Sequence, residues 1–302
     1  MHRNGLVLLL LLWPGLVFAT GDARMTTFAH VSDLHFGRVV DDVAEAMIDS
    51  FEQLDPDFIV ISGDLTQRAR SREFEKANDF LARLPVPYLI VPGNHDLAAF
   101  NLIERFAAPW GKWQRFIARD LEPIMQADGA VIKGVNTARR LADLRDWSEG
   151  SINEEQLIAV DAAMEDAPTD DLRLLVAHHP FWLPEPHAHR DVVGGRDEAL
   201  PHLKHAGIDM ILSGHIHLAF AHILDGMIIS HAGTGTSDRL LPGYPNSFNV
   251  VRGSREQLSI TLMEYRHNAF TAAGNERFSK VEGEWEYVDD SASRAVNASF
   301  GQ

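Results

Sequence analysis

Short apolar runs of strand length alternate along the chain with segments of helical periodicity. Each run is apolar over nearly its whole length and is bounded by Gly, Pro, Asp or His, which is typical of strands buried on both faces. The six clearest runs are Phe28–Val31, Phe58–Ile61, Tyr88–Val91, Leu172–Ala177, Met210–Leu212 and Met227–Ile229. Strands separated by helices predict an α/β domain.

Three amphipathic helices are expected between these strands. Ser71–Leu84 places its apolar side chains on one stripe, and Asp197–Ala206 is stopped by the glycine that follows it. A capping-box pattern of Ser151 and Glu154 is expected to begin a third helix, which runs through Met164.

The pattern changes after about Phe248. Apolar and polar residues then alternate, as at Leu258, Ile260 and Leu262, so we expect antiparallel strands that close a second sheet. We expect one folded domain over residues 25–288 and a loose, polar tail over residues 289–302.

Residues 1–24 contain an apolar run, Leu6–Ala19, after a basic start at Arg3. Its 14 residues fall short of the roughly 20 that a membrane-spanning helix needs, so no membrane span is expected. The run is typical of a signal peptide, with Val17 and Ala19 placed at a cleavage site, which predicts a periplasmic or secreted protein. Alternatively, translation starts at Met25, the leader is never made and the protein is cytoplasmic.

Asp, Asn and His residues follow five of the predicted strands at the point where each strand ends. The five blocks are Asp33–His35, Gly63–Asp64, Gly93–Asp96, His178–Pro180 and Gly214–His217. Ligands of open α/β sheets bind at the carboxyl ends of the strands, so these blocks should meet at one edge. Any single block could be a capped turn or a packed histidine, but five together indicate a metal site.

The absence of cysteine limits the chemistry of that site. With no cysteine and 15 histidines, the chain must hold a metal through nitrogen and oxygen. Imidazole, carboxylate and amide ligands suit manganese, iron, zinc or cobalt and do not select among them. The net charge of −16 argues against long nucleic acid or an anionic membrane as a partner. A metal pair would supply the local positive charge that an anionic substrate needs.

The blocks follow the order D-x-H, G-D, G-N-H-[DE], H and G-H-x-H, and from about Met25 to His217 the sequence resembles the calcineurin-like metallophosphoesterase superfamily. The likeness is greatest to the bacterial branch that includes class III cyclic nucleotide phosphodiesterases. It implies a four-layer αββα sandwich of the metallophosphoesterase type, with two divalent metal ions held by seven side chains. Carried over block by block, these side chains are Asp33, His35, Asp64, Asn94, His178, His215 and His217.

The resemblance also implies how the ligands divide. Asp64 would bridge the two ions. His178 is preferred to His179 because it is the first residue of the His-x-Pro turn, which leaves His179 as a structural or substrate-facing neighbour. The remaining ligands would divide into one set of Asp33, His35 and His217 and another of Asn94, His178 and His215.

Two catalytic roles follow from the same resemblance. His95 would stabilise the transition state and protonate the leaving oxygen. Asp96 would orient the His95 ring, as carboxylates beside metal sites do, or else cap a helix over Leu97–Phe106.

Departures from other branches narrow the subfamily. Gln67 stands where purple acid phosphatases carry a tyrosine, and Leu65–Gln67 replaces the Asp-Arg-Gly signature of protein serine/threonine phosphatases. Lipid A precursor hydrolases of the superfamily have arginine in place of His95. His231 follows the last strand of the same sheet and is a candidate to line the pocket. Arg68, Arg70 and Arg72 keep two interpretations, as phosphate contacts or as the solvated start of a helix.

These features predict a dinuclear-metal-dependent phosphoesterase acting on a small phosphoester. The expected substrates are phosphodiesters of the cyclic nucleotide or glycerophosphodiester type, with monoesters also open, attacked in line by a metal-bridging hydroxide. One alternative is a nuclease of the same superfamily, which the net charge opposes. Another is a metal-dependent scaffold protein with weak catalysis, which the intact His95 and ligand positions oppose.

Overall fold

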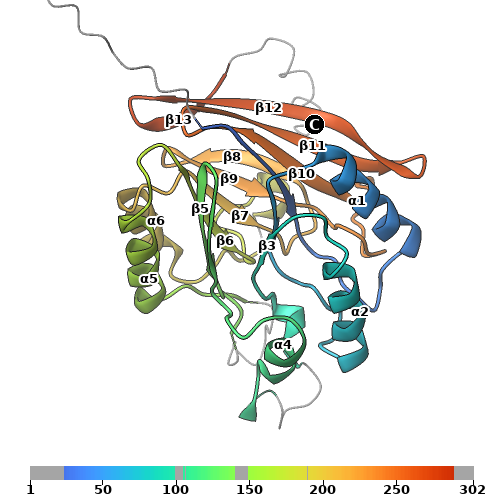
Figure 1. Ribbon diagram of the computed structural model, residues 1–302. Helices are drawn as coiled ribbons and strands as arrows, with labels where there is room; N and C mark the ends of the chain where they lie inside the picture. The colour runs from blue at the N-terminus through green and yellow to red at the C-terminus, as the bar shows by residue number, and fades with distance from the viewer. Residues whose placement is uncertain (1–23, 99–104, 106, 140–148, 189, 289–302) are drawn as a thin grey trace, which may run out of the picture.

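The computed structural model describes residues 24–98, 105, 107–139, 149–188 and 190–288 (Figure 1). Two β-sheets pack face to face, and helices lie on their outer surfaces. The predicted tail, most of the predicted leader and most of the helix expected over Leu97–Phe106 lie outside the described residues. None of the helices in the described ranges is both long enough and apolar enough to cross a membrane.

The first sheet has the strand order β13-β12-β11-β10-β1-β2-β3. Its three parallel strands are β1 (Thr26–Val31), β2 (Phe58–Ile61) and β3 (Tyr88–Ile90). Its antiparallel strands are β10 (Ser247–Gly253), β11 (Gln257–Arg266), β12 (Ala269–Val281) and β13 (Glu284–Tyr287). The expectation that these antiparallel strands close a second sheet is wrong, because β10 pairs directly with β1 and so extends the first sheet.

The second sheet has the order β4-β5-β6-β7-β9-β8. Strands β5 (Ala130–Val135), β6 (Leu172–Ala177), β7 (Met210–Ser213) and β9 (Met227–His231) are parallel. Strands β4 (Ile124–Ala127) and β8 (Phe220–Leu224) pair antiparallel at its two edges. The six predicted strands belong to these two sheets. Strands β4, β5 and β8 were not predicted from the apolar runs.

Helices α1 (Asp41–Leu54) and α2 (Ser71–Leu81) cover the first sheet, and α5 (Glu154–Glu165) and α6 (Arg196–His205) cover the second (Figure 1). The short helix α4 (Gly111–Phe116) packs beside α2. Two 3₁₀ turns, η1 (Asn94–Asp96) and η2 (Glu185–His187), lie in the loops.

Two predicted helix ends differ from the structure by more than one residue. Helix α2 stops at Leu81 rather than Leu84. The capping box expected from Ser151 and Glu154 is wrong: Asn153 accepts a hydrogen bond from the Gln156 backbone N–H, and the Gln156 side chain bonds back to the Asn153 N–H. An asparagine satisfies the first turn as well as a serine does, and the helix therefore begins at Glu154.

Three hydrophobic clusters define the layers. One lies between α1, α2 and the first sheet, and includes Met47, Phe51 and Phe74. A second lies between the two sheets. The third lies between the second sheet and α5 and α6, and includes Val160 and Leu203. These clusters make the domain a four-layer αββα sandwich, as the resemblance implies.

Candidate metal centre

The five polar blocks converge where β1, β2, β3, β6 and β7 end. These strands belong to two different sheets, so the blocks meet across the sandwich rather than along one sheet edge. The loops of the two sheets bond to one another: the His215 N–H donates to Asp33 Oδ2 at 2.9 Å, and His178 Nδ1 lies 2.8 Å from the Ser62 carbonyl. The site is therefore a junction between the two sheets.

The first ligand group consists of Asp33, His35 and His217, whose ligand atoms lie within 4.8 Å of one another. Nε2 of His217 lies 3.2 Å from Asp33 Oδ1 and 3.2 Å from Nε2 of His35. Both His35 and Asp33 are fully buried. Asp33 Oδ1 has no hydrogen-bond partner among the described residues, although Oδ2 accepts a hydrogen bond from the His215 N–H at 2.9 Å. A buried carboxylate oxygen aimed at two imidazoles fits a cation.

The second ligand group consists of Asp64, His178 and His215, with ligand atoms again within 4.8 Å of one another. Asn94 joins it, because its Oδ1 lies 3.2 Å from His178 Nε2 and 3.1 Å from His215 Nδ1. Asp64 also faces the first group. Its Oδ1 lies 3.3 Å from His178 Nε2, and its Oδ2 lies 3.7 Å from His35 Nε2.

Main-chain carbonyls orient three of the four predicted histidine ligands. A carbonyl close to Nδ1 favours the tautomer with hydrogen on that atom, which leaves the Nε2 lone pair for a metal. These pairs are His35 with the Thr66 carbonyl at 3.4 Å, His178 with the Ser62 carbonyl at 2.8 Å and His217 with the Arg239 carbonyl at 2.7 Å. The imidazoles are thus held for metal binding by the backbone.

Left-handed backbone is concentrated at these residues. Non-glycine residues rarely adopt positive φ, and they persist there only where the surrounding structure enforces it. The φ angles are 54° at Asp33, 48° at His35, 52° at Asp64, 74° at His215 and 63° at His217. Five of the seven predicted ligands therefore carry backbone strain, which turns their side chains toward a common point.

Two glycines of the motifs lie so close to predicted ligands that no side chain would fit there. A Cβ on Gly93 would lie 2.1 Å from Asp64 Oδ1, and a Cβ on Gly214 would lie 2.5 Å from Asp33 Oδ2. Either contact would displace a predicted ligand, so the glycines leave room for the carboxylates.

Electrostatics set the protonation states of the ligands. Burial alone would raise the pKa of Asp33, but the neighbouring imidazoles, led by His217, hold it well below its usual range. Burial likewise opposes ionisation of Asp64, yet His178 and other imidazoles hold its pKa well below the usual range. Burial lowers the pKa of His215 far below its ordinary value. Burial would also lower the pKa of His178, but Asp64 outweighs it and raises that pKa to about 9, so a metal there must displace a proton.

His95 lies at the open side of the site. Its side chain is 27% exposed, and its Nε2 lies 4.0 Å from Asp64 Oδ2. Its Nδ1 lies 2.8 Å from the Gln67 carbonyl, so the backbone orients this ring too.

The carboxylate of Asp96 bonds to backbone groups rather than to the His95 ring, whose orientation was one of its two expected roles. Its carboxylate accepts hydrogen bonds from the backbone N–H groups of Leu65, Thr66 and Gly93, at 2.8–3.1 Å, and from the Thr66 hydroxyl. Burial and the Asp64 charge raise the pKa of Asp96 to about 6. Asp96 therefore links the loop that follows β2 to η1, and it caps the start of η1 by accepting a hydrogen bond from the Gly93 N–H.

His179 and His231, whose roles were left open, are both buried. The Thr137 hydroxyl lies 2.7 Å from His179 Nδ1, and the His179 ring packs 4.8 Å from the ring of His215, which fits a structural neighbour of the ligands. His231 is fully buried and stacks on Phe220 with ring centroids 4.4 Å apart, so it belongs to the core and does not line the pocket.

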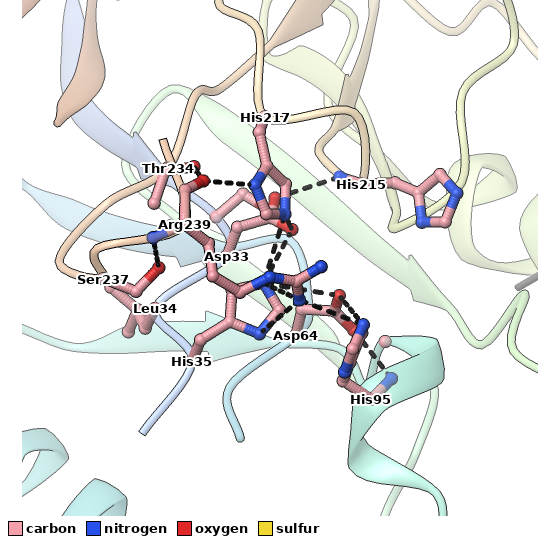
Figure 2. A network of polar contacts seen from close by, with 12 residues as sticks. Asp33, Leu34, His35, Asp64, His95, His215, His217, Thr234, Ser237 and Arg239 are labelled. Atoms are coloured by element: carbon pink, nitrogen blue, oxygen red, sulfur yellow. Dashed lines mark hydrogen bonds and ion pairs between the residues drawn. The ribbon is translucent and has the colours of Figure 1, made fainter. Parts of the chain in front are cut away.

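Arg239 is a site residue that the sequence did not indicate. Its guanidinium lies between His35 and His95, with Nη1 3.1 Å and 3.0 Å from their respective Nε2 atoms (Figure 2). A lone arginine in a loop between Ser237 and Tyr244 carries no spacing signal, and only the tertiary structure brings it to the site.

Seven ligand-type side chains thus meet where strands of the two sheets end. A calcineurin-like phosphoesterase family model matches residues 26–219. The chain belongs to the calcineurin-like phosphoesterase family. It is accordingly a metal-dependent hydrolase of phosphoric esters, and each ligand position of the motif lies within the matched range.

Two curated relatives have names that specify phosphodiesters. A Synechococcus protein named "Probable cyclic nucleotide phosphodiesterase" is 27% identical over 66% of this chain and 76% of its own length. An Arcobacter nitrofigilis protein named "Probable glycerophosphodiester phosphodiesterase" is 23% identical over 59% of this chain and 63% of its own length.

Among solved structures, purple acid phosphatase from yellow lupin has a similar fold. It aligns with a TM-score of 0.64 at 12% identity, over 84% of this chain and 54% of that one. At this identity the likeness concerns the fold alone, and Gln67 still stands where purple acid phosphatases carry tyrosine.

Proposed function

We propose that the chain is a phosphodiesterase whose two divalent metal ions share Asp64. The observation that carries this proposal is that the two oxygens of one buried carboxylate face two ligand groups, at 3.7 Å from His35 Nε2 and 3.3 Å from His178 Nε2. The first ligand group would hold one ion, and His178, His215 and Asn94 would hold the other. The names of the two relatives support a diester as substrate, of the cyclic nucleotide or glycerophosphodiester type.

Each residue would have a defined part in hydrolysis. When bound, two dications would polarise the phosphoryl group and lower the pKa of a coordinated water. Asp64 would hold the two ligand groups in register. His95, oriented by the Gln67 carbonyl and open to solvent, would take up a proton from solvent on Nε2 and deliver it to the departing alcohol oxygen.

The first experiment measures metal binding and turnover together. Wild-type protein should bind two Mn²⁺ per chain by isothermal titration calorimetry and hydrolyse bis(4-nitrophenyl) phosphate, and EDTA should abolish the hydrolysis. Asp64→Asn should lose one bound ion or both and at least about 1,000-fold in kcat/KM, which corresponds to roughly 4 kcal/mol. His95→Asn should keep both ions and lose about 100-fold or more in kcat.

A matched control separates these effects from general loss of an acidic side chain. Asp161 pairs with His202 on the outer helices at 2.6 Å, with its side chain 43% exposed, and Asp161→Asn should keep both the metals and the activity. If Asp64→Asn kept full activity, the proposal that two metal ions share Asp64 would be wrong.

Substrate class requires a separate comparison. Manganese-loaded enzyme should hydrolyse 3′,5′-cyclic AMP or a glycerophosphodiester with a higher kcat/KM than it hydrolyses 4-nitrophenyl phosphate. A preference for the monoester by the same measure would make the chain a phosphomonoesterase and overturn the diester part of the proposal.

A further inference from the structure

Arg239 brings a fixed positive charge to the centre of the site. Its Nη1 lies 3.0 Å from Nε2 of His95, the proposed proton donor, and 3.1 Å from Nε2 of His35 in the first ligand group (Figure 2). In the described part of the chain, the side-chain contacts of this guanidinium are to imidazole nitrogens of His35 and His95 and to no carboxylate. An unpaired guanidinium in an acidic protein is suited to bind an anion.

The loop that carries Arg239 is held from both sides. The Asp238 carboxylate accepts two hydrogen bonds from the Arg38 side chain, at 2.7 Å and 3.0 Å, and the Asp238 N–H donates to the Arg38 carbonyl. The Arg239 carbonyl accepts a hydrogen bond from the Thr234 hydroxyl at 3.1 Å, and His217 Nδ1 lies 2.7 Å from the same oxygen. The backbone of Arg239 is thus tied to a predicted metal ligand, so its side chain is placed relative to the metal centre.

The donors of the guanidinium exceed the acceptors around it. Arginine has five N–H donors, and the polar contacts of this guanidinium to described residues all involve Nη1. The side chain is only half-buried, so it can reach a molecule that enters from solvent. The Nε2 lone pair of His35 can serve Nη1 or a metal, but not both, so metal binding there leaves a further N–H donor for another acceptor.

We propose that Arg239 binds a non-bridging oxygen of the substrate phosphoryl group, on the side of the site occupied by His95. This inference rests on the proposed function, because it assumes that a phosphoryl group binds at the metal centre. A guanidinium beside the proton donor would position the phosphoryl group through a charge-assisted hydrogen bond and add a positive charge to those of the metals.

The test uses inorganic phosphate and the manganese-loaded protein. Calorimetric titration should show that Arg239→Met binds phosphate at least about 10-fold more weakly than wild type, while its Mn²⁺ stoichiometry stays the same and its Mn²⁺ affinity stays within about twofold. Arg239→Lys should recover part of the phosphate affinity, because it restores the charge without the planar fork. Arg252, an exposed arginine on β10 that bonds Thr27, provides the control Arg252→Met, which should bind phosphate as wild type does.

Two outcomes would overturn the inference. If Arg239→Met binds phosphate as tightly as wild type, the residue does not contact the phosphoryl group. If it loses Mn²⁺ as well as phosphate, Arg239 acts through the loop and His217 rather than on the substrate. Failure of the proposed function would give a different result. The wild-type protein would then bind Mn²⁺ and phosphate but hydrolyse no diester. The phosphate affinities of wild type and Arg239→Met would still show whether Arg239 binds the phosphoryl group.

Discussion

The two ends of strand β7 each have a buried aspartate beside them, and the two carboxylates are neutralised in different ways. At the amino end, Asp209 accepts hydrogen bonds from Arg255 at 3.0 Å and from the Trp285 indole at 3.2 Å, and it pairs with Lys280. At the carboxyl end, Asp33 accepts one hydrogen bond, from the His215 N–H, and its other oxygen faces imidazoles without a hydrogen-bond partner among the described residues.

This difference separates a structural ion cluster from a site that needs a ligand. Asp209 has its compensating cations within the chain, Lys280 on β12 and Arg255 in the turn between β10 and β11, and it links this part of the first sheet to the second sheet. Asp33 and Asp64 have mainly histidines around them, in backbone that is strained at five ligand positions. One end of the sandwich has its buried charge paired within the chain, whereas the other has strained backbone and carboxylates at the candidate metal centre.

The largest expected effect contrasts these two aspartates. Asp209→Asn should lower the free energy of unfolding by about 3–5 kcal/mol, because it leaves Arg255 and Lys280 without their buried partner. Asp33→Asn in EDTA should cost less than Asp209→Asn, because the amide oxygen can still accept the His215 N–H and the imidazoles beside it can release protons. Urea unfolding of both variants provides the comparison.

Manganese sharpens the same comparison. Saturating Mn²⁺ should stabilise wild type and Asp209→Asn by a similar amount, about 2.7 kcal/mol at 100 times the dissociation constant, and should stabilise Asp33→Asn much less. If the two variants lost the same free energy of unfolding without metal, or gained the same amount from Mn²⁺, the two buried aspartates would not differ in how their charge is compensated.

A smaller effect concerns acid stability. Burial lowers the pKa of His231 to about 3, below the ordinary value of 6.5, so the unfolded chain binds one more proton than the folded chain between these limits. The stability from neutral His231 is complete above pH 6.5 and is lost as pH falls toward 3, at about 1.4 kcal/mol per pH unit. His231→Phe, stacked on Phe220, should flatten the dependence of unfolding free energy on pH by that amount.

The measurement is chemical unfolding between pH 4 and pH 7 in EDTA, so that metal release does not contribute. The exposed His205 provides a control, since His205→Phe should keep the wild-type slope. A wild-type slope in His231→Phe would show that this histidine does not titrate as a buried neutral group.

The smallest effect is expected at an exposed ion pair. Arg83 donates two hydrogen bonds to Glu45, at 2.7 Å and 2.6 Å, but both side chains are about half exposed. Arg83→Ala should therefore change the unfolding free energy by less than about 1 kcal/mol, by urea denaturation under the same conditions as the Asp209 variant. A loss of several kcal/mol would mean that good geometry, rather than burial, makes the Asp209 cluster important.

Much of the fold could be predicted because the buried strands are nearly continuous apolar runs. Phe58–Ile61 and Leu172–Ala177 have the predicted bounds. Strand β5 was missed because Lys133 and Gly134 interrupt its pattern, yet Lys133 is only 4% exposed and its ammonium donates to the Glu122 carbonyl. A buried lysine with a backbone partner has no periodic signature.

The polar blocks predicted which residues meet, but not what surrounds them. The ligand-type residues of the two groups do converge, and their assignment to particular metal ions stays a proposal. The contacts of Asp96 with the loop after β2, and of the Gln67 carbonyl with His95, depend on how separate loops pack, so the sequence could not decide between the two roles left open for Asp96.

By itself, the sequence determined the family, the nitrogen and oxygen chemistry of any metal site and the order of the ligand blocks, because each block follows a strand that its own apolar residues specify. Only the tertiary structure decided that the antiparallel strands extend the first sheet, that Asp64 faces both ligand groups and that Arg239 lies beside His95. These features arise from contacts between residues as far apart as Phe28 and Val251, and such pairings depend on the packing of the whole sandwich rather than on any local pattern.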